Sequence, residues 1–117
     1  RHNKHKLAMS NAVKALNLKL FADEKYLSPS ITAIKTEGID AEEFRKTIKN
    51  NFDILLAGGQ DHLKGKIFRV GHLGYVTDRD IITVVSAISN TLLELGKISA
   101  QQAGEALVVA SKYLEVT

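Results

Sequence analysis

The chain has 117 residues, of which 44% are hydrophobic and 25% charged, and its formal net charge is +3. This length suits one domain with a single core, and the composition excludes disordered, collagen-like and membrane-spanning chains. The absence of cysteine excludes disulfides, thiolate metal sites and a cysteine nucleophile. We therefore expect a single domain over 1–117, without a membrane partner and with a cytoplasmic location.

The first half of the chain alternates between helix and strand signals. Met9 and Leu16 recur at helical spacing among alanines, whereas β-branched residues follow Pro29, which cannot donate to a strand ladder. Asp40 and Glu43 have the spacing of a capping box and predict a further helix start. The elements that we expect here are a helix at 1–16, strands at 18–21 and 31–36, and a helix at 41–51.

Two further strands, at 53–57 and 66–70, are expected on either side of the glycine-bounded loop 58–65. The first rests on the apolar run Ile-Leu-Leu at 54–56, which has the length of a buried strand. The loop invites comparison with a phosphate-binding loop. However, five residues separate Gly59 from Gly65 where the Walker pattern has four, and Lys66 is followed by isoleucine. A hairpin loop is therefore favoured over a phosphate site.

The last third of the chain predicts two helices with clear boundaries. Thr77 or Asp78 can cap the first, whose apolar residues keep a 3.6-residue period for over four turns, and Gly96 ends it. Ser99 and Gln102 form a second capping-box pattern. With these helices at 78–95 and 100–115, the order of elements favours an α+β fold, in which helices pack on one face of a small, largely antiparallel sheet.

The histidines and the basic N-terminus predict no dedicated site. His2 and His5 lie one helical turn apart, but no further ligand accompanies them, so a solvated helix start is favoured over a metal site. His62 and His72 each stand alone. The basic residues of 1–6 would allow nucleic-acid binding, but aromatic residues are not interleaved with them. We therefore expect no metal and no nucleic-acid partner.

Arg69 is the one candidate binding residue, because it interrupts an otherwise apolar strand. Strand residues alternate between faces, so Phe68 and Val70 point one way, and Ile67 and Arg69 the other. A guanidinium is always charged and must reach solvent, an acid or a bound anion, and its planar fork suits a carboxylate. The residues alone leave two interpretations: an edge arginine that reaches solvent or pairs with an acid, and a ligand site.

The motif Lys-Ile-Phe-Arg-Val-Gly-His-Leu-Gly at 66–74, followed by Thr-Asp-Arg-Asp at 77–80, resembles the C-terminal domain of class V aminotransferases of the alanine:glyoxylate and serine:pyruvate type. Ser28-Pro29 and Gly38-Ile39-Asp40 also look like this family, which includes relatives labelled soluble hydrogenase small subunit or tritium exchange subunit. The resemblance spans essentially the whole chain. It covers only about the last third of a family member, so it implies one domain of a larger enzyme.

This resemblance implies a function and a role for Arg69. Family members use pyridoxal phosphate to move an amino group between a small amino acid, such as alanine or serine, and a 2-oxo acid, such as glyoxylate or pyruvate. Arg69 matches the arginine that binds the substrate carboxylate, and Gly71 and Gly74 would let the backbone turn beside that site. The lysine that holds the cofactor lies in the family's large domain, so neither Lys64 nor Lys66 is that lysine.

We therefore expect an aminotransferase domain that contains no catalytic or cofactor-binding residue and is inactive alone. Its expected partners are its own large domain, a second subunit of a homodimer and the amino-acid or oxo-acid substrate. The alternative is a free-standing interaction or regulatory module associated with a soluble hydrogenase. A third hypothesis, nucleic-acid binding through residues 1–6, rests on charge alone.

Overall fold

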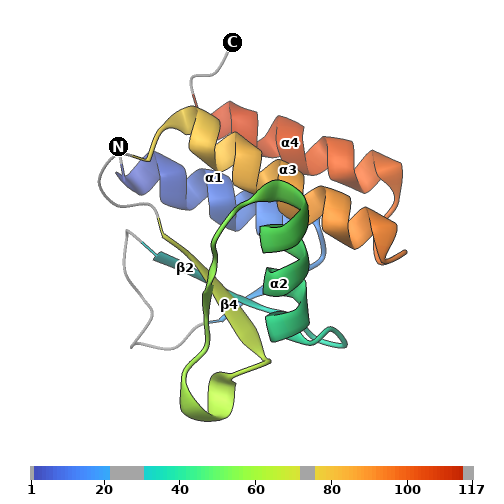
Figure 1. Cartoon of the computed structure of the whole chain (residues 1–117). Helices are drawn as coiled ribbons and strands as arrows, with labels where there is room; N and C mark the ends of the chain where they lie inside the picture. Colours follow the sequence, from blue (N-terminus) through green and yellow to red (C-terminus); the bar gives the residue numbers. More distant parts are fainter. Residues whose placement is uncertain (1, 22–30, 72–75, 115–117) are drawn as a thin grey trace.

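The structure of the chain is a computed structural model that describes residues 2–21, 31–71 and 76–114 (Figure 1). Within these ranges, four α-helices and four short strands form two layers. The elements are α1 (His2–Ala15), β1 (Lys19–Leu20), β2 (Ile31–Lys35), α2 (Ala41–Phe52), β3 (Ala57–Gly58), the 3-10 helix η2 (Asp61–Leu63), β4 (Ile67–Gly71), α3 (Asp78–Glu94) and α4 (Ala100–Tyr113). None of the helices in these ranges has the length and apolar character needed to span a membrane.

The strands form one antiparallel sheet in the order β1-β2-β4-β3. β2 and β4 make its centre, and their register pairs Ile34 with Phe68 and Ala33 with Arg69. Because side chains alternate across a strand, Ile34 and Phe68 share one face of the sheet, whereas Ala33 and Arg69 share the other. Neighbouring residues of β4 therefore lie in different environments, one on each face of the sheet.

All four helices cover the face of the sheet that carries Phe68. α1, α3 and α4 lie side by side, and α2 packs beside α3 at the β3 edge of the sheet (Figure 1). Phe68 is fully buried, and its ring centroid lies 5.3 Å from that of Phe44 on α2. The same core takes Ile34 and Val70 from the sheet and Leu92 from α3. The predicted α+β fold, with helices on one face of a largely antiparallel sheet, is confirmed.

The predicted starts of the last two helices are confirmed, including their capping boxes. The Thr77 hydroxyl accepts from the Asp80 N–H while the Asp80 carboxylate accepts from the Thr77 N–H, and Ser99 and Gln102 form the same reciprocal cap. Thr77, not Asp78, is thus the N-cap of α3. After α3 the chain turns at Gly96, whose φ of 71° lies in the left-handed region that glycine adopts without strain.

Two local predictions in the middle of the chain are wrong. The run 54–56 is not a strand, and Leu55 is 81% exposed. The reason is that α2 extends to Phe52 and ends on Asp53 in a left-handed conformation (φ 56°), so the chain reaches the sheet only at Ala57. Nor is there a capping box at α2, because the Asp40 carboxylate accepts from the Glu42 N–H, one residue earlier than predicted.

Candidate functional site

Arg69 lies in the middle of β4, on the face of the sheet that the helices leave uncovered. Its neighbours in register on either side are alanines, Ala33 on β2 and Ala57 on β3. Methyl side chains at both flanking positions leave the longer arginine side chain room to rise above the sheet. Arg69 is partly buried, as expected for a side chain whose stem lies on the sheet surface.

The inner end of the Arg69 guanidinium is fixed by the neighbouring edge strand. Its Nε donates a hydrogen bond of 3.0 Å to the carbonyl oxygen of Gly58 on β3. A guanidinium presents its other donors on the two terminal nitrogens, at the far edge of the same plane. The bond to Gly58 therefore restricts the orientations in which the terminal nitrogens can lie.

The segment that holds Arg69 is itself held by Arg45 on α2. Arg45 binds both carboxylate oxygens of Glu42, with Nε–Oε2 and Nη2–Oε1 distances of 3.1 and 2.7 Å. Its Nη1 donates to the carbonyl oxygen of Leu56 at 2.7 Å. Hydrogen bonding by Arg45 holds the pKa of Glu42 below its ordinary value, against the opposing effect of burial. Glu42 is thus kept ionised as a partner for Arg45.

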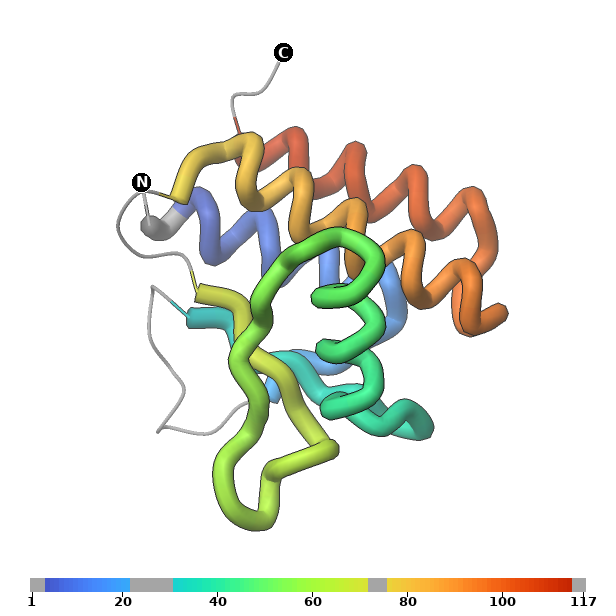
Figure 2. The backbone as a smooth tube through the Cα atoms, viewed as in Figure 1, coloured from blue at the N-terminus to red at the C-terminus, as the bar shows by residue number. Residues whose placement is uncertain are grey.

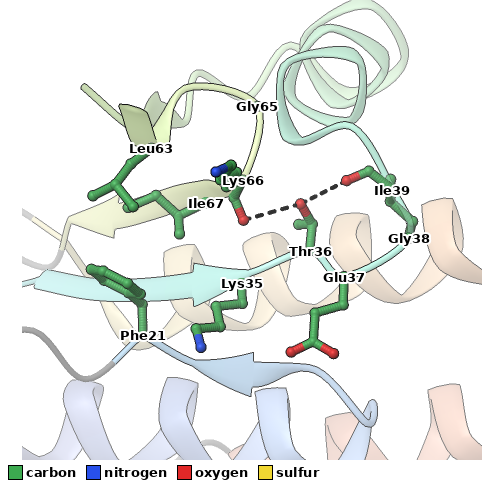
Figure 3. Close-up of a pocket in the computed structure, with 10 residues that line it drawn as sticks. All are labelled: Phe21, Lys35, Thr36, Glu37, Gly38, Ile39, Leu63, Gly65, Lys66 and Ile67. Atoms are coloured by element: carbon green, nitrogen blue, oxygen red, sulfur yellow. Dashed lines mark hydrogen bonds between the residues drawn. The ribbon is translucent and has the colours of Figure 1, made fainter. Parts of the chain in front are cut away.

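A groove of about 520 Å³ lies further along the uncovered face, beyond Ile67 (Figure 3). Phe21, Leu63 and Ile67 give it apolar walls, and Lys35 and Glu37 stand at its rim (Figure 3). Arg69 does not line this groove. The uncovered face therefore carries two separate features, the arginine at its centre and an apolar groove at one end.

Of the other residues that the sequence singled out, Lys66 lines the apolar groove, whereas Gly71, His62 and Lys64 do not. Gly71 is exposed, with open space where a side chain would be. His62, Lys64 and Lys66 are exposed in and after the loop, which Figure 2 shows extending past the end of the sheet. Ser28, Pro29, His72 and Gly74 lie outside the described residues, and so does the expected turn at 22–26. Across the described ranges, no three His, Cys, Asp or Glu side chains are grouped closely enough to hold a metal ion.

A polar cluster between α1 and α3 was not predicted from the sequence. His5, which was predicted to be solvated, is 1% exposed, and its Nε2 lies 2.8 Å from Oδ1 of Asp78, the first residue of α3. Lys4 donates to the other carboxylate oxygen at 3.0 Å. The signal was present, because His5 precedes Met9 by four residues and Leu16 by eleven, on the buried side of the helix.

Relatives of known family share both the sequence and the fold of this chain. A soluble hydrogenase 42 kDa subunit from Anabaena cylindrica is 55% identical over 96 residues, 82% of this chain and 25% of the relative. The (S)-ureidoglycine–glyoxylate transaminase of Bacillus subtilis is 32% identical over 112 residues, 94% of this chain and 26% of the relative. A crystal structure of ureidoglycine-glyoxylate aminotransferase from Bacillus subtilis superposes with a TM-score of 0.82 at 30% identity, covering 95% of this chain and 30% of that one.

The chain belongs to the class V aminotransferases and corresponds to their C-terminal domain. It spans about a quarter of the length of the curated relatives that it matches. These relatives confirm the predicted resemblance. No protein-family model matches the chain.

Proposed function

We propose that this chain is the substrate domain of a pyridoxal-phosphate-dependent aminotransferase. The enzyme would move an amino group between a small amino acid, alanine or serine, and a 2-oxo acid, glyoxylate or pyruvate. In this proposal Arg69 binds the α-carboxylate of the substrate. The observation that carries it is the position of Arg69, a cation at the centre of the uncovered sheet face in a domain of aminotransferase fold.

The geometry suits a two-point grip on a carboxylate. The Nε bond to Gly58 restricts rotation of the guanidinium, so fewer conformations are lost when a ligand binds. We assign the ligand contacts to the two terminal nitrogens, which match the spacing of two carboxylate oxygens. Held in this way, the substrate would present its α-carbon in one orientation, which is the contribution of a positioning group to catalysis.

Pyridoxal phosphate would supply the electron sink for the amino transfer, and we assign its contacts to a separate large domain. A cofactor-holding lysine is typically enclosed with its partner groups, whereas Lys64 and Lys66 are both exposed. The proposed partners of the chain are that large domain and a second subunit, and the proposed location is the cytoplasm. Alone, the chain would not transaminate.

The test uses a joined polypeptide, in which this chain is connected to a large domain that binds pyridoxal phosphate. Arg69→Lys keeps the charge but loses the planar fork, and Arg69→Ala loses both, so transamination should fall in that order. The KM for the amino-acid substrate, alanine or serine, should rise. In Arg69→Ala the rise should be roughly 10-fold or more, because a charge-assisted bidentate contact is lost. The absorption spectrum of the bound cofactor should stay unchanged, because the proposal has Arg69 contact the substrate and not the cofactor.

Two results would contradict this function. If both variants transaminate with normal rate and KM, Arg69 is an ordinary structural residue. If the DNA directly upstream of the Arg1 codon holds a start codon and no large domain, the chain is a free-standing module. The second result would favour the alternative function, a subunit associated with a soluble hydrogenase, which the name of the Anabaena relative suggests.

A further inference from the structure

Arg45 makes three directed hydrogen bonds, which is more than a helix-surface ion pair requires. Two of them grip the carboxylate of Glu42, three residues earlier on α2. The third leaves the helix and reaches the Leu56 carbonyl oxygen at 2.7 Å. Both charged side chains are about one quarter exposed, 25% for Arg45 and 28% for Glu42. The pair therefore ties α2 to the backbone that leads into β3.

β3 needs such a tie because it is only two residues long and lies at the edge of the sheet. On one side it is held by its ladder to β4, in which Ala57 faces Arg69. On the other side it faces α2, where a Cβ added to Gly58 would lie 2.6 Å from Glu42 Oε2 and 2.8 Å from Arg45 Nη2. Glycine at 58 thus lets the ion pair pack directly against the strand.

We propose that Arg45 and Glu42 are positioning residues for Arg69, acting through β3. Arg45 fixes the carbonyl of Leu56, the ion pair packs against Gly58, and the Gly58 carbonyl holds Nε of Arg69. The orientation of the substrate-binding guanidinium is thereby set from α2, on the far side of the edge strand. Its importance for catalysis rests on the function proposed above, whereas the positioning itself is a property of this chain.

Charge alone does not explain this arrangement. A lysine at 45 could pair with Glu42, but its three donors share one nitrogen atom. They cannot reproduce the separate positions from which Nε, Nη1 and Nη2 of Arg45 reach the two carboxylate oxygens and the Leu56 carbonyl. A comparable pair at the end of the same helix joins the exposed side chains of Lys49 and the C-cap residue Asp53, and this bond does not involve the sheet. Lys49 therefore provides the matched control.

The test is NMR of the 117-residue chain labelled with ¹⁵N, in which exchange of the Arg69 Nε–H proton with water is measured. Arg45→Met should accelerate this exchange by roughly fivefold, as expected when one ordinary hydrogen bond is weakened. Arg45→Lys should accelerate it to a similar extent, because the fork is lost. Lys49→Met should leave it at the wild-type rate. Backbone amide exchange in the centre of β2 should not change in any variant.

Several outcomes would overturn the inference. Exchange at Arg69 that is unchanged in Arg45→Met, or wild-type exchange in Arg45→Lys, would show that the three-way grip does not position Arg69. Equal acceleration in Lys49→Met would indicate a general loss of stability. If Arg45→Met does not fold, Glu42→Gln replaces it, since the amide keeps one oxygen for Arg45 and should give a smaller acceleration in the same direction; no acceleration would count against the inference.

This readout is separate from that of the proposed function. Accelerated exchange in Arg45→Met, together with normal transamination in Arg69→Ala, would support positioning and remove the carboxylate role. Unchanged exchange together with impaired transamination in Arg69→Ala would do the reverse. When both hold, Arg45→Met in the joined polypeptide should raise the KM for the amino acid without changing the cofactor spectrum.

Discussion

The two faces of the five-residue strand β4 differ in what they contact. Phe68 and Val70 point into a core to which all four helices contribute, and they are 0% and 3% exposed. On the other face, the buried cluster formed by the described residues consists of Ala33 and Ile67, against which Phe21 and Leu63 pack. Arg69 lies on this second face, with the smaller buried cluster. Substitutions on the two faces should therefore have different consequences.

The largest effect on stability is expected for Phe68→Ala, on the helix face. Removing this fully buried ring deletes its contact with Phe44 and leaves a cavity, which should lower the free energy of unfolding by about 3–5 kcal/mol. Arg69→Ala removes a half-buried polar side chain, including its hydrogen bond to the Gly58 carbonyl, and leaves no cavity in the core, so it should cost clearly less than Phe68→Ala, about 1–2 kcal/mol. Urea unfolding followed by circular dichroism measures both. Equal losses for the two variants would mean that the uncovered face is as important to the fold as the core.

A smaller effect is expected at the polar junction of α1 and α3. Asp78→Ala removes the hydrogen-bonding partner of the buried His5 and of Lys4, which should lower the free energy of unfolding at neutral pH by about 1–3 kcal/mol. The matched control is Glu37→Ala, which breaks an exposed pair with Lys19 and should change stability by less than about 1 kcal/mol. Similar values for both variants would show that burial of His5 adds nothing to this contact.

The same junction predicts a dependence on pH. Hydrogen bonds from His5 and from Lys4 hold the pKa of Asp78 below its ordinary value of 3.8, against the effect of burial. A carboxyl with a lowered pKa in the folded state stabilises the fold above its unfolded pKa, and this contribution is lost as the pH falls through the folded pKa. Wild-type stability should therefore fall below about pH 3.8, and Asp78→Asn should show a shallower fall. Parallel curves would exclude Asp78 as the source.

Periodicity and capping patterns in the sequence predicted most of the helices that pack on the Phe68 face of the sheet. The helices at Thr77 and Ser99 could be located because their capping patterns precede long apolar repeats, and local chemistry decides such boundaries. The run 54–56 misled the prediction because a short apolar segment has no period of its own, and its conformation follows from the end of α2 at Asp53.

The uncovered face was less predictable, because its contacts join distant parts of the chain. Alternation along β4 predicted that the side chains of Arg69 and Phe68 lie on different faces of the sheet. The family resemblance suggested the role of Arg69. The hydrogen bond to Gly58 and the grip of Arg45 on Leu56 each cross 11 positions in sequence and leave no periodic signal. His5 lay in a detectable helical pattern, but its partner Asp78 is 73 positions away. Such pairs become visible only when the fold is known.

The smallest effect is expected when pyridoxal phosphate is added to the isolated chain. A specific lysine adduct needs a lysine held beside groups that bind the phosphate and the pyridine ring, and the proposal places those groups on a separate large domain. Lys64 and Lys66 are exposed, so the cofactor aldehyde should react with them weakly and without selectivity. Absorption spectra should show no stoichiometric band of lysine-bound cofactor that amino-acid substrate reverses. Lys64→Arg and Lys66→Arg serve as controls, since each removes one primary amine while keeping the charge. A stoichiometric band that either variant abolishes would place cofactor binding in this chain and would contradict its assignment to a separate large domain.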